Sequence, residues 1–287
     1  MSGKNSQGRL LLISRGIAHH SKLSGYGQLS GYLPAERIDN SCRGLLPWVL
    51  LRYLSRTPER PYYSSSGLNK EMIALLSMLK RPGGLLHYLY LDNDLRLAPL
   101  WASRLNYRLT GTLHHPPEML DDVFKRPSDL KKLDGIFCVG ENQVNAVKAI
   151  VGHERVWFVP HGVNVDFFVP QGAPSAERPS CLFVGEMLRD FGLLREVILR
   201  LQAKRRDVSF TIIVWPEKQA LFSGLSNVRV LSNITDAQLR DEYQKATLLL
   251  LPLTNCTANN SILESISCGL PVVTTDVGGV RGYLDNS

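Results

Sequence analysis

The stretch LLLLPLTNCTANNSILESISCGLPVV, residues 248–273, decides the expected fold. Its first four leucines form a short apolar run typical of a strand buried on both faces of a parallel sheet. A polar loop follows over residues 254–261, and residues 262–268 have a helical pattern that a Gly-Leu-Pro sequence ends. In an open parallel sheet, this order places a helix N-terminus at the carboxyl edge of the strands, where anions are stabilised. The stretch therefore predicts an α/β sheet whose edge suits a diphosphate.

Similar apolar runs recur beside segments of helical periodicity along the whole chain, which predicts α/β architecture throughout. The other expected strands lie within residues 9–14, 135–139, 156–159, 181–184, 210–214 and 271–275. We also expect Asp236 to cap a helix that runs through Leu239 and Tyr243 to about Ala246.

The length of 287 residues and the 44% hydrophobic content favour two domains. A segment rich in Pro and Gly and poor in apolar periodicity, residues 169–179, is the best linker candidate. We therefore expect an N-terminal domain over residues 1–172 and a C-terminal domain over residues 173–287.

The cysteines and the apolar runs indicate a soluble chain of a reducing compartment. The five cysteines are odd in number and widely spaced, and they lack the C-x2-C pairing of zinc and redox motifs. The apolar run at Leu10–Ile13 is too short for a signal peptide, and no run approaches the ~20 apolar residues of a membrane-spanning helix. We expect a cytoplasmic protein that does not span a membrane.

Positive charge is concentrated in the first half of the chain. Residues 1–165 hold 21 Lys and Arg against 13 Asp and Glu, whereas residues 166–287 hold 12 against 13. A basic half can attract nucleic acid, an anionic lipid surface or an acidic substrate, or it can simply be a soluble surface. Because no zinc-finger or basic-zipper spacing and no RNA-binding pattern is present, nucleic acid is not expected. Peripheral contact with the cytoplasmic face of a membrane stays open.

Several ordered blocks resemble glycosyltransferase family 4, and the similarity extends from the first expected strand nearly to the last residue. The blocks are residues 24–27, 159–170, 182–185, 227–231, 235–246, 250–252 and 264–279. The resemblance implies the GT-B fold, in which two Rossmann-like domains face each other across a cleft. It also implies transfer of a sugar from a nucleotide diphosphate sugar with retention of configuration, in a hexosyltransferase-type enzyme of polysaccharide biosynthesis.

The same resemblance assigns donor-binding residues in the second half. Glu264 matches the second acid of the family's E-x7-E motif, which is expected to hydrogen-bond the nucleotide ribose and is expected to be catalytic. The remaining members of the expected donor site around this motif are Thr257, Ala258, Asn259, Asn260, Ser261 and Leu263. The alternatives are an exposed helix glutamate and plain helix caps that need no ligand.

In the first half, His114 is the match to the family's active-site histidine, which is expected to contact the transferred sugar or the migrating proton. A structural histidine is the alternative. A metal site is not expected, because neighbouring His114 and His115 project differently and no carboxylate follows at helical spacing. Gly25 and Gly27 match a glycine loop that lets the backbone approach the donor, with an ordinary turn as the alternative.

Three departures from the family pattern put the activity in doubt. Cys256 stands where the first glutamate of the E-x7-E motif is expected. After Gly185, Asp190 and Phe191 occupy the positions of the family's phosphate-binding Arg and Lys, so we expect Arg189, one place away, to substitute. The chain ends at Ser287, before the last elements of a GT-B domain, so the second domain is expected to be C-terminally truncated and incomplete.

The expected function is glycosyl transfer without a cofactor or metal, with a nucleotide diphosphate sugar as donor substrate. The helix amides near Asn259 and Asn260, with Arg189, would stabilise the charge of the leaving diphosphate. The acceptor is a glycan, a lipid-linked sugar or a small molecule. The alternatives are a catalytically inactive nucleotide-sugar binding protein or partner subunit, and a nucleotide-sugar epimerase.

Overall fold

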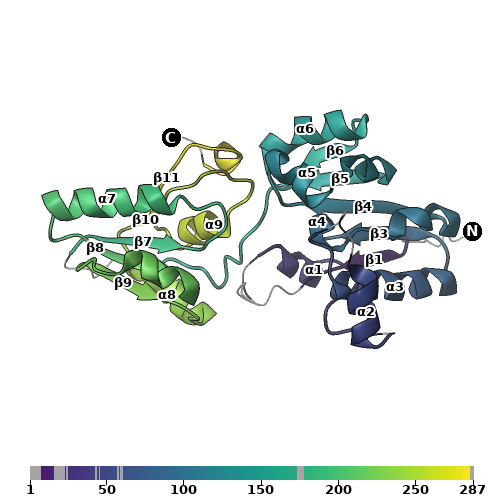
Figure 1. Ribbon diagram of the computed structural model, residues 1–287, viewed down its shortest axis with the longest axis horizontal. Helices are drawn as coiled ribbons and strands as arrows, with labels where there is room; N and C mark the ends of the chain where they lie inside the picture. The colour runs from purple at the N-terminus through teal and green to yellow at the C-terminus, as the bar shows by residue number, and fades with distance from the viewer. Residues whose placement is uncertain are drawn as a thin grey trace, which may run out of the picture. The chain divides into compact units, whose positions relative to one another are not determined.

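A computed structural model describes residues 8–15, 23, 25–42, 44, 46–56, 58, 61–172 and 178–284 (Figure 1). The described chain forms two compact units: the first comprises residues 8–15 and 26–160, and the second comprises residues 23, 25 and 161–284. Residues 161–172 belong to the second unit, where Phe168 is fully buried in its core. The sequence placed the boundary instead between residues 172 and 173.

Unit 1 is built on a six-stranded parallel sheet in the order β2-β1-β3-β4-β5-β6. Its strands are β1 (Leu10–Ile13), β2 (Glu36–Ile38), β3 (Gly84–Tyr88), β4 (Tyr107–Leu113), β5 (Gly135–Cys138) and β6 (Val156–Phe158). Its longer helices are α2 (Trp48–Ser55), α3 (Ser65–Lys80) and α6 (Glu141–Val151). Short helical turns complete it: η1 (Tyr26–Gln28), α1 (Leu29–Tyr32), α4 (Leu91–Asp94), η2 (Ala98–Leu100), η3 (Ser103–Leu105), η4 (Pro117–Met119), α5 (Leu120–Val123) and η5 (Pro127–Lys132).

Unit 2 is built on a five-stranded parallel sheet in the order β11-β10-β7-β8-β9. Its strands are β7 (Ser180–Val184), β8 (Ser209–Ile213), β9 (Val228–Leu231), β10 (Leu248–Leu251) and β11 (Val272–Thr274). Its helices are α7 (Phe191–Lys204), η6 (Pro216–Phe222), α8 (Asp236–Lys245), α9 (Asn260–Ser267) and η7 (Val280–Gly282). Each unit has its own hydrophobic core, so the expected α/β architecture with two parallel sheets is confirmed.

Local capping decides where the helices of unit 2 begin. Thr235 caps α8, since its hydroxyl accepts from Gln238 N and the Gln238 side chain accepts from Thr235 N in a capping box. The expectation that Asp236 is the cap was therefore wrong, because Asp236 is the first residue of the helix itself. Helix α9 starts at Asn260, ahead of the expected residue 262, because Asn259 caps it.

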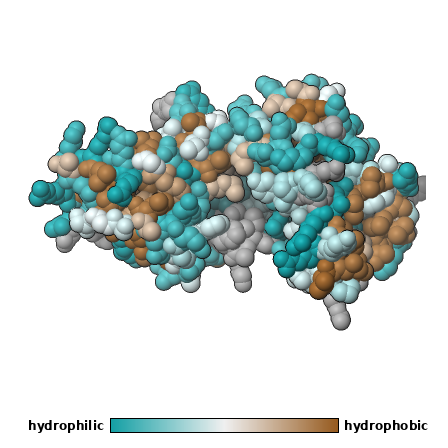
Figure 2. All heavy atoms as spheres, in the orientation of Figure 1, coloured by the Kyte–Doolittle hydropathy of each residue, from teal (hydrophilic) through white to brown (hydrophobic). Residues whose placement is uncertain are grey.

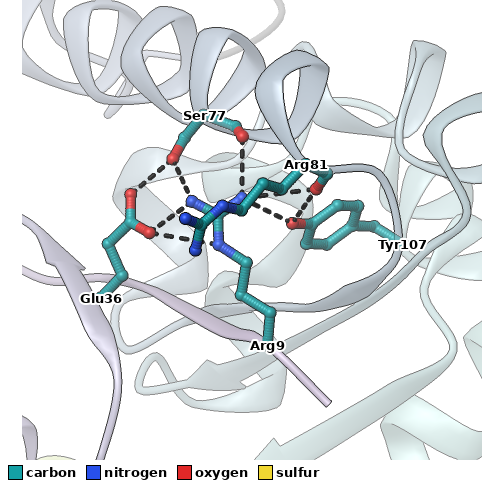
Figure 3. A network of polar contacts seen from close by, with 5 residues as sticks. All are labelled: Arg9, Glu36, Ser77, Arg81 and Tyr107. Carbon is teal, nitrogen blue, oxygen red and sulfur yellow. Dashed lines mark hydrogen bonds and ion pairs between the residues drawn. The ribbon is translucent and has the colours of Figure 1, made fainter. Parts of the chain in front are cut away.

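A polar network closes the amino edge of the unit 1 sheet around Arg9, the residue before β1 (Figure 3). The Arg9 guanidinium donates to Ser77 O at 2.8 Å, to Tyr107 Oη at 3.1 Å and to the Glu36 carboxylate. Tyr107 Oη in turn donates to the backbone carbonyl of Arg81 at 2.9 Å. One side chain thereby ties β1 to β2, to the end of α3 and to the first residue of β4.

The cysteines make no disulfide: Cys138, Cys181, Cys256 and Cys268 are buried free thiols, and Cys42 is partly exposed. In the part of the chain that the structure describes, no helix has both the length and the apolarity that crossing a bilayer requires.

Candidate functional site

The expected donor-binding residues of unit 2 converge at the carboxyl edge of its sheet, where the loops after β7 and β10 meet the start of α9. The Asn259 side chain accepts from Ser261 N at 3.0 Å and from Ile262 N at 3.4 Å. Leu263 N donates to the backbone carbonyl of Asn259. The amides of Ser261 and Ile262 are therefore occupied by the cap, as in the helix-cap interpretation, while Asn260 occupies the first helical position.

The Arg189 side chain links the carboxyl end of β7 to the start of α9. Its Nε donates to Val184 O at 3.0 Å, and its Nη2 donates to Ser261 Oγ at 3.1 Å and to Asn259 Oδ1 at 3.4 Å. Gly185 has a φ of +95°, a conformation that favours glycine, and a Cβ there would lie 2.8 Å from Arg189 Nη2 and so would displace the guanidinium. Burial lowers the pKa of Arg189 to about 10, which still leaves a cation at neutral pH.

Glu264 is a buried carboxylate, with 3% of the residue exposed, rather than an exposed helix residue. Tyr243 Oη on α8 donates to Glu264 Oε2 at 2.9 Å. Burial and the nearby charge of Glu264 raise the pKa of Tyr243 well above its usual value, so the phenol keeps its proton. The pair places an acceptor-rich carboxylate one turn into α9, held in orientation by a neutral donor.

Cys256 is buried beside the Gly278-Gly279 turn, so the loop after β10 lies against the turn that follows β11. Its Sγ donates to Thr257 O at 3.2 Å, and burial raises the pKa of the thiol to about 11, so it stays protonated. Gly279 N donates to Cys256 O at 2.8 Å. Gly278 has a φ of +56°, and a Cβ there would lie 2.3 Å from Cys256 O. Only glycine fits at residue 278 without moving the loop that holds residues 256–258.

In unit 1, His114 follows β4 directly and is held by four surrounding residues. Its backbone N–H donates to Asp92 Oδ2 at 2.9 Å, and its Nε2 lies 2.8 Å from Leu89 O. Because a carbonyl only accepts, Nε2 carries the proton of the ring. Tyr90 stacks on the imidazole with ring centroids 4.6 Å apart, and Tyr26 meets it edge-on at 4.9 Å. Burial lowers the pKa of His114, which favours the neutral ring.

Asp92 is the residue that sequence reasoning missed, although it organises both histidines. Its Oδ1 lies 3.0 Å from His115 Nδ1 and accepts from His115 N at 3.3 Å. Burial alone would raise the pKa of Asp92, but the hydrogen bond and charge of His115 hold it below its usual value. Burial likewise opposes protonation of His115, yet Asp92 raises the pKa of His115 overall. The nearest sequence signal was the acidic Asp-Asn-Asp stretch that begins at residue 92.

Gly27 of the expected glycine loop lies next to Tyr90, which stacks on His114. Gly25 has a φ of +86°, and a Cβ at Gly27 would lie 3.5 Å from Arg15 O and 4.0 Å from Tyr90 Oη. Gly27 and His114 are thus joined through Tyr90. Ser24, the first residue of the quoted glycine block, lies outside the described residues.

A buried ion pair supports the same edge of unit 1. Lys70 Nζ donates to Asp94 Oδ2 at 2.6 Å and to Ser14 O, at the end of β1, at 3.1 Å. The side chains of Lys70 and Asp94 are 1% and 0% exposed. The neighbouring Glu71 accepts from the hydroxyls of Tyr63 and Tyr88 and from the backbone N–H groups of residues 96–98.

Within the described ranges, no group of three or more His, Cys, Asp and Glu side chains is arranged to hold a metal ion. The unit 2 edge brings the partly buried Arg189 cation beside a helix N-terminus, and the unit 1 edge holds an imidazole of lowered pKa among aromatic rings.

Comparison with known proteins gives a family match over part of the chain and structural matches over nearly all of it. Residues 178–287 match the family model described as "Glycosyl transferases group 1". A curated relative, the phosphatidylinositol N-acetylglucosaminyltransferase gpi3 subunit of Schizosaccharomyces pombe, is 25% identical over 169 residues. That match covers 54% of this chain and 37% of the relative, so the chain spans well under two thirds of the relative's length.

Solved structures show the fold. The catalytic domain of starch synthase IV from Arabidopsis thaliana, bound to ADP and acarbose, aligns with a TM-score of 0.69 at 13% identity, over 97% of this chain and 85% of that one. Anabaena HepE in complex with UDP-glucose aligns with a TM-score of 0.66 at 12% identity, over 97% and 83%. Sucrose-phosphate synthase from Thermosynechococcus elongatus aligns with a TM-score of 0.64 at 16% identity, over 96% and 83%. The chain therefore has the GT-B fold.

Proposed function

We propose that this chain is a retaining glycosyltransferase that moves a sugar from a nucleotide diphosphate sugar, bound by unit 2, to an acceptor bound by unit 1. The match of residues 178–287 to a glycosyl transferase model supports the reaction class. Two of the structures with the same fold hold ADP or UDP-glucose, which supports the donor class. Family 4 membership remains part of this proposal.

The observation that carries the proposal is the partly buried Arg189 guanidinium beside the N-terminus of α9. Departure of a nucleotide diphosphate builds negative charge on the leaving group, and a preorganised cation with a helix N-terminus stabilises such charge without reorganising solvent. In this proposal Arg189 supplies the phosphate-binding positive charge that the family's Arg and Lys supply at the positions of Asp190 and Phe191. The cap already occupies the backbone N–H groups of Ser261 and Ile262. The N–H groups that contact the diphosphate would therefore come from the loop before Asn260.

Glu264 is proposed to accept hydrogen bonds from the ribose hydroxyls of the donor. Its hydrogen bond from Tyr243 orients the carboxylate, and charge-assisted bonds to two hydroxyls would add affinity and direction. Gly185, Thr257, Ala258 and Leu263 are proposed to line the same donor site by their positions around this cluster.

His114 is proposed to contact the transferred sugar as a neutral imidazole, because burial lowers its pKa and Nε2 already donates to Leu89 O. Gly25 and Gly27 are proposed to let the donor approach the same aromatic setting. No cofactor or metal takes part in this scheme, and the nucleotide sugar is the sole co-substrate.

The acceptor is proposed to be a glycan or a lipid-linked molecule. The curated relative is named as a subunit of a transferase acting on phosphatidylinositol, which supports both a lipid acceptor and assembly with partner chains. We also propose peripheral contact with the cytoplasmic face of a membrane, which a lipid acceptor and the basic balance of residues 1–165 support.

A second function, donor binding without turnover, is favoured by Cys256. A protonated, buried thiol at this position supplies no carboxylate to the sugar, so transfer would rely on the remaining groups. In this alternative the chain is a nucleotide-sugar binding protein or a partner subunit.

Calorimetric titration with UDP, GDP, ADP and their sugar conjugates tests both functions. We expect micromolar binding of one nucleotide, weakened by Glu264→Gln and unchanged by Glu196→Gln, an exposed glutamate of α7. Release of nucleotide from the conjugate in the presence of lipid or glycan extracts separates transfer from binding alone. Binding without release that Cys256→Glu converts into release would favour the second function, and no binding by folded protein would contradict both.

A further inference from the structure

Helix α2 differs from an ordinary surface helix because the side that faces away from the core is apolar. Leu51 and Ser55 are buried, and Leu51 packs in a small cluster with Tyr63 and Leu68. On the outside, Trp48 is 61%, Val49 80% and Tyr53 76% exposed. Helices on the surface of a globular protein normally carry polar side chains on the face opposite the core.

The exposed side chains of α2 form one surface, which we call the α2 face. It consists of Trp48, Val49, Leu50, Tyr53 and Leu54 with Arg52 and Arg56. At 100° per residue, Trp48, Arg52, Arg56, Val49 and Tyr53 follow one another around an arc of roughly 140°, so the two arginines lie among the apolar side chains. Figure 2 shows hydrophobic side chains gathered over α2 and α3.

The charge of the α2 face is positive and uncompensated. The helix sequence WVLLRYLS contains no acidic residue. Within the described parts of the chain, neither Arg52 nor Arg56 makes an ion pair, and both are exposed. Helix α7 of unit 2 shows the contrast, since its exposed face carries the Arg200–Glu196 ion pair.

The geometry points to the surface of an anionic lipid bilayer as the occupant of the α2 face. Trp and Tyr favour the interface between lipid headgroups and acyl chains, and arginines among them attract anionic headgroups. The surrounding half of the chain adds charge of the same sign, with 21 Lys and Arg against 13 Asp and Glu in residues 1–165.

A protein partner fits this surface less well. The eight residues of α2 span about 12 Å. A stable protein interface usually buries roughly 800 Å² on each partner, which two turns of one helix do not supply. A bilayer requires no such area from one helix, because it adds affinity through the charge of the whole surrounding surface. This inference concerns unit 1 alone and holds whether or not the chain transfers sugar.

Sedimentation with vesicles tests the α2 face, comparing phosphatidylcholine vesicles with vesicles that also contain phosphatidylglycerol. We expect binding only to the anionic vesicles, and weaker binding as salt concentration rises. The double change Arg52→Gln with Arg56→Gln should weaken binding roughly thirtyfold, since each arginine near an anionic surface contributes a factor of about five. Trp48→Gln with Tyr53→Gln should weaken it by at least about tenfold through lost apolar insertion.

Matched controls in unit 2 separate this surface from general charge and hydrophobicity. Arg206→Gln and Trp215→Gln change an exposed arginine and a half-exposed tryptophan far along the chain and should leave vesicle binding unchanged. Vesicles with brominated lipids should quench the fluorescence of wild-type protein, and Trp48→Phe should remove most of that quenching while Trp215→Phe keeps it. Circular dichroism confirms that each variant is folded.

Three results would overturn the inference. The first is a folded wild-type protein that binds both kinds of vesicle equally or neither. The second is a loss of binding that is the same in the controls as in the α2 variants. The third is self-association in solution that Trp48→Gln with Tyr53→Gln abolishes, which would make the α2 face an interface between protein chains.

Discussion

The carboxyl edges of the two sheets are built in opposite ways. In unit 2, the edge is made from two short, contiguous stretches, the loop at residues 185–190 and the loop and helix start at residues 254–264. The partly buried Arg189 guanidinium joins them. In unit 1, the edge is made from side chains that lie far apart in sequence, such as Lys70 with Asp94 and Asp92 with His115.

This difference separates what each edge is suited to do. Backbone groups and a single cation can meet a ligand common to many enzymes, such as a diphosphate, with little dependence on side-chain identity. Buried pairs of charged side chains fix a particular arrangement of strands and leave the exposed groups to vary. The comparison predicts that changes at the unit 1 edge cost stability, whereas changes at the unit 2 edge cost ligand affinity.

The largest expected effect is at the buried ion pair of unit 1. Lys70→Met should lower the free energy of unfolding by about 3–5 kcal/mol, because it leaves the Asp94 carboxylate buried without its cation. Urea denaturation measures the loss, and hydrogen exchange in β1 and β3 assigns it to unit 1. The double change Lys70→Met with Asp94→Leu should recover most of it, and a double variant as unstable as the single one would contradict this explanation.

The next effect concerns ligand affinity at the unit 2 edge. Arg189→Met should weaken nucleotide diphosphate binding by about 2 kcal/mol, or roughly thirtyfold, since it removes the cation beside the start of α9. The nucleotide affinity of Arg189→Lys should lie between those of wild type and Arg189→Met, because an ammonium keeps the charge but cannot make the same set of contacts. Calorimetry measures both, with Arg229→Met at the opposite edge as the control. An equal loss in the control would show that the effect is not local.

A smaller effect distinguishes capping from binding within unit 2. Asn259→Ala and Thr235→Ala each remove a helix cap and should each lower stability by about 1 kcal/mol. Only Asn259→Ala should also change nucleotide affinity, because Thr235 caps α8 and not α9. Thermal unfolding and calorimetry on the same samples give both quantities. Identical affinities in the two variants would remove α9 from the donor site.

The smallest effect is the pH dependence of the Asp92–His115 pair. The folded-state pKa of His115 is raised above 6.5, so its contribution is full below 6.5 and is lost as pH rises through the raised value. The pKa of Asp92 is held below 3.8, so its contribution is present above 3.8 and is lost as pH falls through the lowered value. The stability difference between wild type and Asp92→Asn should therefore be larger near about pH 5.5 than near about pH 8.5.

Imidazole NMR titrations check the same assignment residue by residue. His115 should titrate above the usual value, and His114 below it. In Asp92→Asn the pKa of His115 should fall, because the carboxylate that raises it is gone. A stability difference that grows with pH would contradict the pairing.

Each of the seven apolar runs contains a strand, but β2, β3, β4 and β9 were not among them. β2 and β9 are edge strands, whereas β3 and β4 lie inside the unit 1 sheet. These two strands carry a buried hydrogen-bonded series in which Thr112 Oγ1 lies 3.2 Å from Tyr26 Oη and 3.3 Å from His87 Nε2. His87 Nδ1 in turn lies 2.9 Å from Thr110 Oγ1. Burial lowers the pKa of His87 to about 4, so this ring is a neutral core residue.

The residues of the candidate site also divide into those that the sequence could predict and those that it could not. The unit 2 cluster could be predicted because its residues are adjacent in the chain and follow a strand, so a local pattern places them. Asp92, Lys70 and Asp94 could not, because each depends on a partner more than twenty residues away, and an isolated Asp or Lys is usually a surface residue. The Tyr243 partner of Glu264 was in a predicted helix, but only the packing of α8 on α9 brings the two together.

The unequal exposure of the five thiols makes this chain suitable for labelling. Cys42 in unit 1 is partly exposed, and the other four are buried. A maleimide dye should therefore attach to Cys42 in the native protein with little side reaction. Adding one surface cysteine in unit 2, for example Ala203→Cys on the exposed side of α7, would supply a second attachment point. Energy transfer between two dyes would then report, molecule by molecule, how the separation of the units responds to a bound nucleotide.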